Sequence, residues 1–308
     1  MSETVFDAHV HIWSADRDRF PMVPGRERPA EPDGSAEALL REMDAAGVGA
    51  ALLVQTPWLG EDNRYLVDAG RRFPGRFVSL GWLEDPLAAD APDRLRRQYG
   101  ADGCRGVRLH LTDARVNAGV LDGRADPLLR AAAGLGVPVQ FLNRPPTHPT
   151  VLAVARRFPD LDLVVDHLGH PDPEDAPDYP GMAPFFALAA HPRVYVKVSN
   201  HVLHSTRPAP WTDLHAFQGR VLERFGPRRL MWGSNWPMQL PSPDYGERLR
   251  AVSEHLPGLS AGDRAWVLGG TARSLWPPRP VRPVRPAGAA PPGAPTRRRS
   301  APLRPRSC

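Results

Sequence analysis

The sequence predicts an α/β protein folded as a single (β/α)8 TIM barrel, and two observations support this. Short runs rich in apolar and β-branched residues alternate with longer amphipathic stretches, which is typical of βαβ units around a parallel sheet. There are eight such runs, and eight parallel strands close into a barrel. The expected strands are Val5–His11, Ala50–Gln55, Phe77–Leu83, Cys104–His110, Val137–Leu142, Leu161–His167, Val194–Ser199 and Leu230–Asn235.

The stretches between these strands predict helices, several of which end at Gly or Pro. A nucleotide-binding open sheet is disfavoured, because Ile12-Trp13-Ser14 follows the first strand where such a fold needs a glycine-rich turn. The expected helices are Ala36–Ala46, Arg64–Arg72, Leu128–Leu135, Val151–Phe158, Pro184–Ala190 and Leu214–Phe225.

The C-terminal segment 277–308 differs in composition from the rest of the chain. It holds ten Pro and eight of the 39 Lys and Arg, but none of the 34 Asp and Glu. Residues 1–276 therefore carry 31 basic and 34 acidic residues, a formal charge of −3 against +5 for the whole chain. We expect a barrel over 1–276 and a disordered Pro/Arg-rich tail over 277–308, a solvated appendage rather than a nucleic-acid-binding arm.

Composition also indicates the cellular compartment of the protein and the kinds of partner that it binds. Cys104 and Cys308 are too few for a disulfide framework or a thiolate metal site. The residues before Val5 do not form the basic and apolar regions of a signal peptide, and no apolar stretch in the sequence reaches the ~18 residues of a membrane span. We expect a cytoplasmic protein with a small-molecule substrate and with neither a membrane nor a nucleic-acid partner. The oligomeric state stays open.

The first strand carries the most informative pair of residues. Simple alternation places Asp7, His9 and His11 on one face of this strand. Two imidazoles at adjacent inward positions, at the end of a barrel strand, are the arrangement that two ligands of one divalent metal require. The alternative is a pair of hydrogen-bonded core histidines.

Two other strand ends supply polar side chains. His167 ends the sixth strand and is expected to face the same cavity; the alternative is a capping histidine bonded to a loop carbonyl. Arg108 and His110 share a face of the fourth strand. A guanidinium there suits a substrate carboxylate or lactone oxygen, or else pairs with a carboxylate of the barrel.

The remaining polar candidates are expected to line the cavity. Lys197, the only lysine of the chain, shares a face of the seventh strand with Tyr195 and Ser199. Gln55 ends the second strand and Gln140 lies in the fifth, where each is polar lining or hydrogen-bonded interior. The expected substrate-binding residues are Arg108, His110, Gln55 and Lys197. A surface position is expected for His148, His170, His191, His201, His204, His215 and His255.

Most of these candidates belong to longer segments with a recognisable order. The segments are Phe6-Asp-Ala-His-Val-His-Ile-Trp13, Arg105-Gly-Val-Arg-Leu-His110, Val165-Asp-His-Leu-Gly169, Tyr195-Val-Lys-Val-Ser199, Met231-Trp-Gly-Ser-Asn-Trp-Pro237 and Leu268-Gly-Gly-Thr-Ala-Arg-Ser-Leu-Trp276. In this order they resemble the amidohydrolase-related family of the metal-dependent hydrolase superfamily, in particular its sugar-lactone and 2-pyrone-4,6-dicarboxylate lactonase branch. The resemblance covers residues 5–276.

The resemblance implies a hydrolase whose catalytic residues are His9, His11, His167 and Asn235. The family usually has an aspartate at the position of Asn235, where it takes a proton from the attacking water. An amide has no titratable proton near neutral pH and cannot be a general base. The fifth strand, Val137–Leu142, also lacks the histidine that metal-dependent members carry. We therefore expect either no metal or one weakly held divalent ion, such as zinc, on His9, His11 and His167.

Three functional hypotheses follow. The first is a hydrolase that opens a lactone or related ester of a small anionic substrate. In it His9, His11 and Arg108 stabilise the oxyanion, and His167 or hydroxide on a metal replaces the missing base. The second is a decarboxylase or hydratase-like lyase, which the same family includes. The third is a catalytically silent barrel that binds a small ligand, because a fold does not prove an activity.

Overall fold

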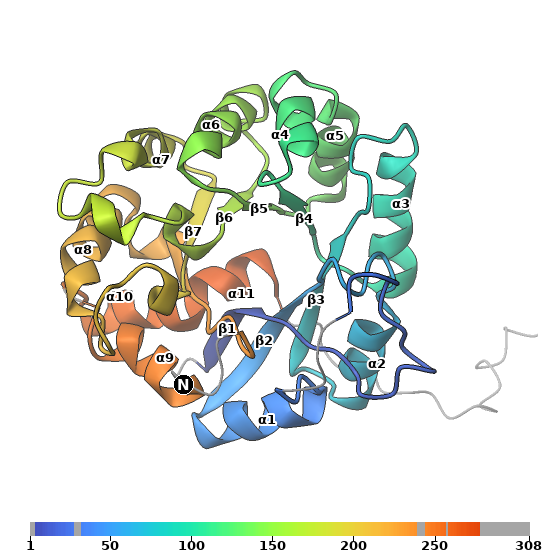
Figure 1. Ribbon diagram of the computed structural model, residues 1–308, viewed down its shortest axis with the longest axis horizontal. Helices are drawn as coiled ribbons and strands as arrows, with labels where there is room; N and C mark the ends of the chain where they lie inside the picture. Colours follow the sequence, from blue (N-terminus) through green and yellow to red (C-terminus); the bar gives the residue numbers. More distant parts are fainter. Residues whose placement is uncertain (1–3, 28–31, 239–243, 257, 278–308) are drawn as a thin grey trace, which may run out of the picture.

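A computed structural model of the protein describes residues 4–27, 32–238, 244–256 and 258–277. Eight strands follow one another in sequence order around a barrel, and each is parallel to the next (Figure 1). The barrel closes where Val10 bridges Trp236, just beyond the last strand. The predicted (β/α)8 fold is confirmed. The strands are β1 (Val5–Val10), β2 (Val48–Val54), β3 (Phe77–Trp82), β4 (Val107–His110), β5 (Val139–Leu142), β6 (Leu163–Val165), β7 (Val194–Val198) and β8 (Leu230–Trp232).

Most helices surround the strands on the outside of the barrel, whereas α11 lies across the centre of this view and packs against the interior apolar residues (Figure 1). All six predicted helices are present, although α7 is shorter than expected and continues as a 3-10 turn over Leu188–Ala190. The helices are α1 (Ala36–Ala45), α2 (Arg64–Arg72), α3 (Ala91–Arg97), α4 (Ala114–Leu121), α5 (Asp126–Leu135), α6 (His148–Arg157), α7 (Ala183–Ala187), α8 (His215–Phe225), α9 (Tyr245–Ser253), α10 (Ala261–Ala265) and α11 (Thr271–Leu275).

Local capping explains where several helices begin and end. The Ser35 hydroxyl accepts a hydrogen bond from the backbone N–H of Ala38 at 3.1 Å and starts α1. Gly136 follows α5 with φ of 64°, the left-handed conformation in which glycine ends a helix without a Cβ clash.

The apolar core has two layers. One lies between the strands and the surrounding helices and includes the outward residues of β4 to β8. The other fills the barrel interior with Phe6, Leu52, Leu80 and Met231, and the fully buried Trp276 packs against it. Further along the strands the inward residues become polar, as at Arg108 and Lys197. The polar part of the interior therefore lies toward the C-terminal ends of the strands, where active sites of TIM barrels are built.

Strand β1 departs from simple alternation. Asp7 pairs with Ala51 but Val10 pairs with Leu53, so β1 accommodates one extra residue between these two pairs. The bulge turns Asp7 outward to α9, where the Tyr245 hydroxyl donates to its carboxylate at 2.9 Å. His9 instead contacts side chains of the barrel interior. The prediction that Asp7 shares a face with His9 and His11 is wrong, because the bulge shifts the alternation.

The described part of the chain ends shortly after α11. Residues 278–308, nearly all of the predicted tail, lie outside the described residues. Among the helices that the structure describes, none has the length and apolar character needed to cross a membrane.

Candidate active site

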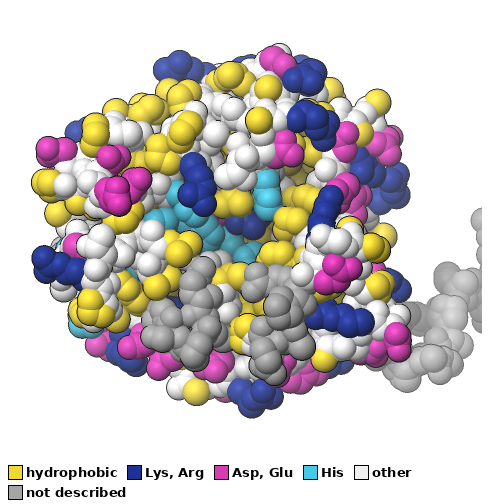
Figure 2. Space-filling view, in the orientation of Figure 1, with side chains coloured by type: hydrophobic (Ala, Val, Ile, Leu, Met, Phe, Trp, Pro, Cys, Tyr) yellow, Lys and Arg dark blue, Asp and Glu magenta, His cyan; other side chains and the backbone are white. Residues whose placement is uncertain are grey.

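Polar side chains from four strands meet at one end of the barrel. Figure 2 shows histidines gathered in a hollow at the centre of this face, with Lys or Arg side chains beside them. The innermost of these groups are almost fully buried, with at most 5% of any of them exposed. We call them the Asp166 cluster: His9, His11, Arg108, Asp166, His167 and Lys197.

Asp166 is the centre of this cluster. Its Oδ2 atom lies 2.8 Å from both Nε and Nη2 of Arg108. Its Oδ1 atom lies 3.3 Å from Nδ1 of His9 and 3.7 Å from Nζ of Lys197. Burial alone would raise the pKa of the Asp166 carboxyl, but the charges of Arg108, His9 and Lys197 outweigh burial and hold this pKa well below its usual range. Sequence analysis missed this residue.

Lys197 is fully buried beside Asp166. Its ammonium group donates to Oε1 of Gln140 at 2.6 Å and lies 3.2 Å from Nδ1 of His9. Burial lowers the pKa of Lys197 to about 7, although the charge of Asp166 opposes this effect. Gln140 thus serves as a hydrogen-bond partner of the only lysine in the chain.

His9 and His11 face each other through their Nε2 atoms, 3.2 Å apart. Nδ1 of His11 lies 2.8 Å from the carbonyl oxygen of Val54, so this nitrogen carries the proton and Nε2 of His11 presents a lone pair. Burial lowers the pKa of His11 to about 3, and the ring is neutral at neutral pH.

His167 reaches the cluster from a turn. Strand β6 ends at Val165, two residues earlier than predicted, and His167 has φ of 51° in the turn that follows. Its Nδ1 atom lies 2.8 Å from the hydroxyl of Ser199 at the end of β7, and its ring centroid lies 4.5 Å from that of His9. His167 therefore faces the same cavity as His9, as the sequence predicts.

The donor set fits a divalent metal. His9, Asp166 and His167 each offer one ligand atom, and these atoms all lie within 4.8 Å of one another. Two nitrogen ligands of a tetrahedral zinc ion are roughly 3.3 Å apart, and the two Nε2 atoms of His9 and His11 are 3.2 Å apart. Asp166 fits less well than the imidazoles, because Arg108 and Lys197 already compensate its charge.

Asn235 is placed by backbone contacts beside His9. Its N–H donates to the carbonyl oxygen of His9 at 2.8 Å, and its side-chain amide donates to Oδ1 of Asn200 at 3.1 Å. Both asparagines have positive φ, 57° and 63°, a conformation that Asn tolerates better than most residues.

Two predicted substrate-binding residues have other neighbours. The amide of Gln55 donates to the carbonyl oxygen of Asp62 and to Oδ1 of Asn63, so it holds the loop after β2 rather than joining the cluster. His110 lies against Trp82, with ring centroids 5.9 Å apart, and Nε2 of His110 has no hydrogen-bond partner among the described residues. With Arg108 it lines a cleft of about 240 Å³.

Several histidines predicted at the surface are buried. His148, His170, His201 and His204 are at most 8% exposed, because the segments that follow the strands fold over the barrel mouth. Nε2 of His148, for example, lies 2.8 Å from the carbonyl oxygen of Gly169. The surface prediction is wrong for these four residues.

Comparison with known proteins assigns the family. The amidohydrolase family matches residues 6–277, and thus both ends of the barrel. The chain belongs to the amidohydrolase family. The resemblance expected from the sequence is therefore confirmed, and the protein is a hydrolase.

Its relatives include lactone hydrolases. This amidohydrolase is 30% identical over 245 residues to an L-fucono-1,5-lactonase of Burkholderia ambifaria, covering 78% of this chain and 83% of the relative. It is 30% identical over 241 residues to a 2-pyrone-4,6-dicarboxylate hydrolase of Comamonas testosteroni, covering 75% and 76%. The chain also resembles the crystal structure of an amidohydrolase from Burkholderia multivorans with bound zinc, with a TM-score of 0.69. The two sequences are 29% identical, and the match covers 88% of this chain and 98% of that one.

Proposed function

We propose that this amidohydrolase opens a lactone or related ester of a small, anionic substrate. The observation that carries the proposal is the Asp166 cluster, in which buried cations and imidazoles surround one carboxylate at the C-terminal end of a barrel. The similarity to two lactone hydrolases supports the choice of substrate class.

The cluster favours negative charge on a carbonyl oxygen. Arg108 brings one positive charge toward the single carboxylate of Asp166, and Lys197, whose pKa is about 7, brings a second while it is protonated, so a positive surplus then faces an oxygen that becomes negative. Such charges act strongly in a buried site because little water screens them. His11 does not donate to this oxygen in the tautomer described above, because its N–H is bonded to Val54 and its Nε2 presents a lone pair toward His9.

His167 is the proposed proton acceptor. If Nδ1 of His167 donates to the Ser199 hydroxyl, Nε2 keeps its lone pair and can take a proton from water that adds to the carbonyl carbon. The same proton then passes to the ring oxygen as the C–O bond breaks, which yields a hydroxy acid. Asn235 cannot do this.

His9 and His11 would hold a divalent metal through their Nε2 atoms, and His167 and Asp166 offer further ligand atoms close to that of His9. When bound, such an ion polarises a carbonyl group and makes water more acidic. His167 keeps its role as proton acceptor only while its Nε2 is not a ligand.

The test is turnover of a panel of γ- and δ-lactones, with and without a carboxylate substituent, measured by acid release with a pH indicator. We expect hydrolysis by the wild type and a rate at least about a hundredfold lower for His167→Asn. The half-buried His191, in the connection before β7, provides a control, and His191→Ala should keep the wild-type rate. Release of carbon dioxide instead of ring opening, or ligand binding without any turnover, would overturn the proposal.

A further inference from the structure

Asp7 is a fully buried carboxylate that the proposed chemistry does not use. Its Oδ1 atom accepts the backbone N–H of His9 at 3.0 Å and the backbone N–H of Ser234 at 2.9 Å. Its Oδ2 atom accepts the hydroxyl of Tyr245, in α9, at 2.9 Å. His9 belongs to β1 and Ser234 follows β8, so one carboxylate oxygen joins the two segments between which the barrel closes.

These two segments carry candidate catalytic residues. The first carries His9 and His11, and the second carries Asn235. The N–H of Asn235 donates to the carbonyl oxygen of His9 at 2.8 Å, and the N–H of His11 donates to the carbonyl oxygen of Trp236 at 2.8 Å. The contacts of Asp7 lie beside these backbone bonds and add to them. Asp7 therefore helps to set where His9 and Asn235 lie relative to each other.

The N–H of His9 lies in the bulge of β1. A bulge leaves one residue outside the regular ladder of backbone hydrogen bonds, and a buried N–H needs an acceptor. The side chain of Asp7 supplies that acceptor from within the same bulge. Removing it would take away a contact that holds the shape of the bulge, and with it the direction of the His9 ring.

Gly233 shows how closely the segment after β8 packs on His9. A methyl group at Gly233 would lie 2.8 Å from Cβ of His9, a separation that such carbon atoms do not show in folded proteins. It would also lie 3.1 Å from the backbone nitrogen of His9, the atom that donates to Asp7. His9 is thus confined by Gly233 on one side and held by Asp7 through its N–H.

We propose that Asp7 is a positioning residue of the active site, whose Oδ1 atom holds His9 against His11 and beside Asn235. The Oδ2 atom anchors the carboxylate to α9 through Tyr245. Asp7 acts on the reaction through His9. The kinetic consequence of this inference rests on the proposed function, whereas the geometry that it describes does not depend on a substrate.

The two oxygens of Asp7 predict different results for two variants. Asp7→Ala removes both contacts of Oδ1, so kcat for the best lactone should fall by about 10- to 100-fold, the usual effect of losing a group that orients an active-site histidine. Tyr245→Phe removes only the contact of Oδ2. It should lower the urea midpoint, because a buried carboxylate oxygen loses its donor, but keep kcat per folded protein within about twofold.

Two further substitutions at Asp7 grade the effect. Asp7→Asn should restore most of kcat, because the amide oxygen can accept both N–H groups and the amide nitrogen can donate to the Tyr245 hydroxyl. Asp7→Ser, a milder change than Asp7→Ala, keeps a hydroxyl that can accept the N–H two residues further along the chain. It should give an intermediate kcat, and it tests the inference even if Asp7→Ala does not fold.

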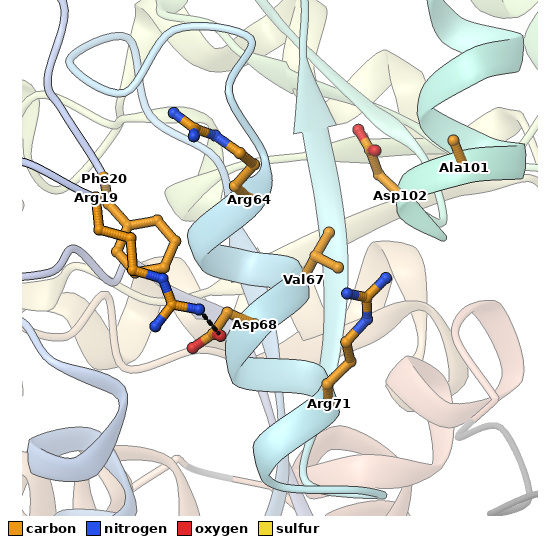
Figure 3. Close-up of a pocket in the computed structure, with 8 residues that line it drawn as sticks. All are labelled: Arg19, Phe20, Arg64, Val67, Asp68, Arg71, Ala101 and Asp102. Carbon is orange, nitrogen blue, oxygen red and sulfur yellow. Dashed lines mark hydrogen bonds and ion pairs between the residues drawn. The ribbon is translucent and has the colours of Figure 1, made fainter. Parts of the chain in front are cut away.

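Asp68 provides a matched control. It lies on α2, lines a cleft of about 300 Å³ and bonds to Arg19 (Figure 3). Asp68→Ala also takes a carboxylate away from its partner, but this carboxylate has no contact with His9 among the interactions of the described residues. The variant should keep the wild-type kcat.

Imidazole NMR signals test the geometry without a substrate. The Nε2 atoms of His9 and His11 are 3.2 Å apart, so the ¹⁵N signals of these rings report their contact. Asp7→Ala should shift both signals and Asp7→Ser should shift them less, whereas Tyr245→Phe and Asp68→Ala should leave them unchanged. The ring of His148, bonded to the carbonyl oxygen of Gly169, should give the same signals in every variant.

The two readouts separate this inference from the proposed function. Shifted His9 and His11 signals in the Asp7 variants support the inference even if the wild type hydrolyses no lactone, a result that would overturn only the hydrolase proposal. If lactones are hydrolysed but Asp7→Ala and Asp7→Ser keep the wild-type signals and kcat, the inference is overturned and the hydrolase stands. An equal loss of kcat in Tyr245→Phe and Asp7→Ala would also overturn it, because Asp7 would then be merely structural.

Discussion

Arg108 is bonded to Asp166 inside the barrel, with Nε and Nη2 of the guanidinium both 2.8 Å from one carboxylate oxygen. Neither side chain is more than 5% exposed. The sequence leaves two roles open for Arg108, a substrate ligand or a partner of a barrel carboxylate, and this contact favours the second. A buried carboxylate that keeps its charge needs such a partner, because removing the partner leaves the charge uncompensated.

Arg108→Ala should therefore destabilise the fold. We expect a loss of about 3–5 kcal/mol in the free energy of unfolding, measured by urea denaturation, because Asp166 loses its main cation. The control is Arg193→Ala, which breaks a 3.0 Å pair with Asp162 in which Arg193 is 46% exposed. That change should cost no more than about 1 kcal/mol. Unchanged stability of Arg108→Ala, together with a raised KM, would return Arg108 to the role of a substrate ligand.

The paired histidines give a test for metal. If a divalent ion is held between the Nε2 atoms of His9 and His11, His9→Ala or His11→Ala should abolish stoichiometric metal in the dialysed protein, measured by elemental analysis. His191→Ala should retain the wild-type metal content. In a metal-free enzyme the same two variants should lose about a hundredfold in rate with no metal to lose. Full activity of metal-free protein would exclude a catalytic metal.

Five buried histidines outside the Asp166 cluster predict sensitivity to acid. Burial lowers their pKa values to about 3 or about 4, whereas the unfolded chain binds these protons near pH 6.5. Below about pH 6.5 the unfolded chain therefore binds more protons than the folded protein. The free energy of unfolding is highest above that pH and falls as the pH falls, by about 1.4 kcal/mol per pH unit for each ring. The five residues are His110, His148, His170, His201 and His204.

We expect the urea midpoint to fall steadily between about pH 6.5 and pH 5. His148→Gln checks the cause, because a glutamine amide can still donate to the carbonyl oxygen of Gly169 but cannot take up a proton. The variant should show a shallower pH dependence by about one proton. A midpoint that stays constant down to pH 5 would show that these rings gain no protons on unfolding.

Which residues of a strand face the barrel interior was predictable for β4 to β8, because side chains alternate between inward and outward along these strands. Alternation along β7 predicts that Lys197 points inward, and the structure places it there. Strand β1 breaks the rule through its bulge, which depends on pairing with β2 and has no signal in the local sequence. The same alternation does place Asp166 on the inner face after Val164, so this residue could have been found from the sequence.

The burial of the loop histidines could not be predicted in this way. His170 and His204 are separated along the chain by all of α7 and β7, yet their rings meet at 5.1 Å. Their contact depends on how two segments fold over the barrel mouth, and neither segment has a periodic pattern that indicates its direction. Gln55 shows the same limit, because its partners belong to the loop that follows it.

The boundary proposed for the barrel is tested by truncation. Trp276 is fully buried, and its indole N–H donates to the carbonyl oxygen of Arg105 at 3.0 Å. A chain ending at Pro277 should keep the urea midpoint and activity of the full chain. A chain ending at Leu275 loses this indole and should lose about 3–5 kcal/mol of stability. A large destabilisation on ending at Pro277 would place part of the barrel's stability in residues 278–308.

The last prediction concerns Asn235, where an amide stands in place of the usual family carboxylate. If His167 takes the proton, a carboxylate at this position adds no function that the enzyme lacks, so Asn235→Asp should change kcat by less than about tenfold while altering the pH profile. The measurement is lactone hydrolysis by both proteins from roughly pH 5 to 9, with bound metal quantified in each. Asn200→Asp is the matched control, because it places the same charge on the partner of the Asn235 amide, 3.1 Å away. A gain of about 10²- to 10⁴-fold for Asn235→Asp alone would mean that the wild type lacks its base, and would contradict the role proposed for His167.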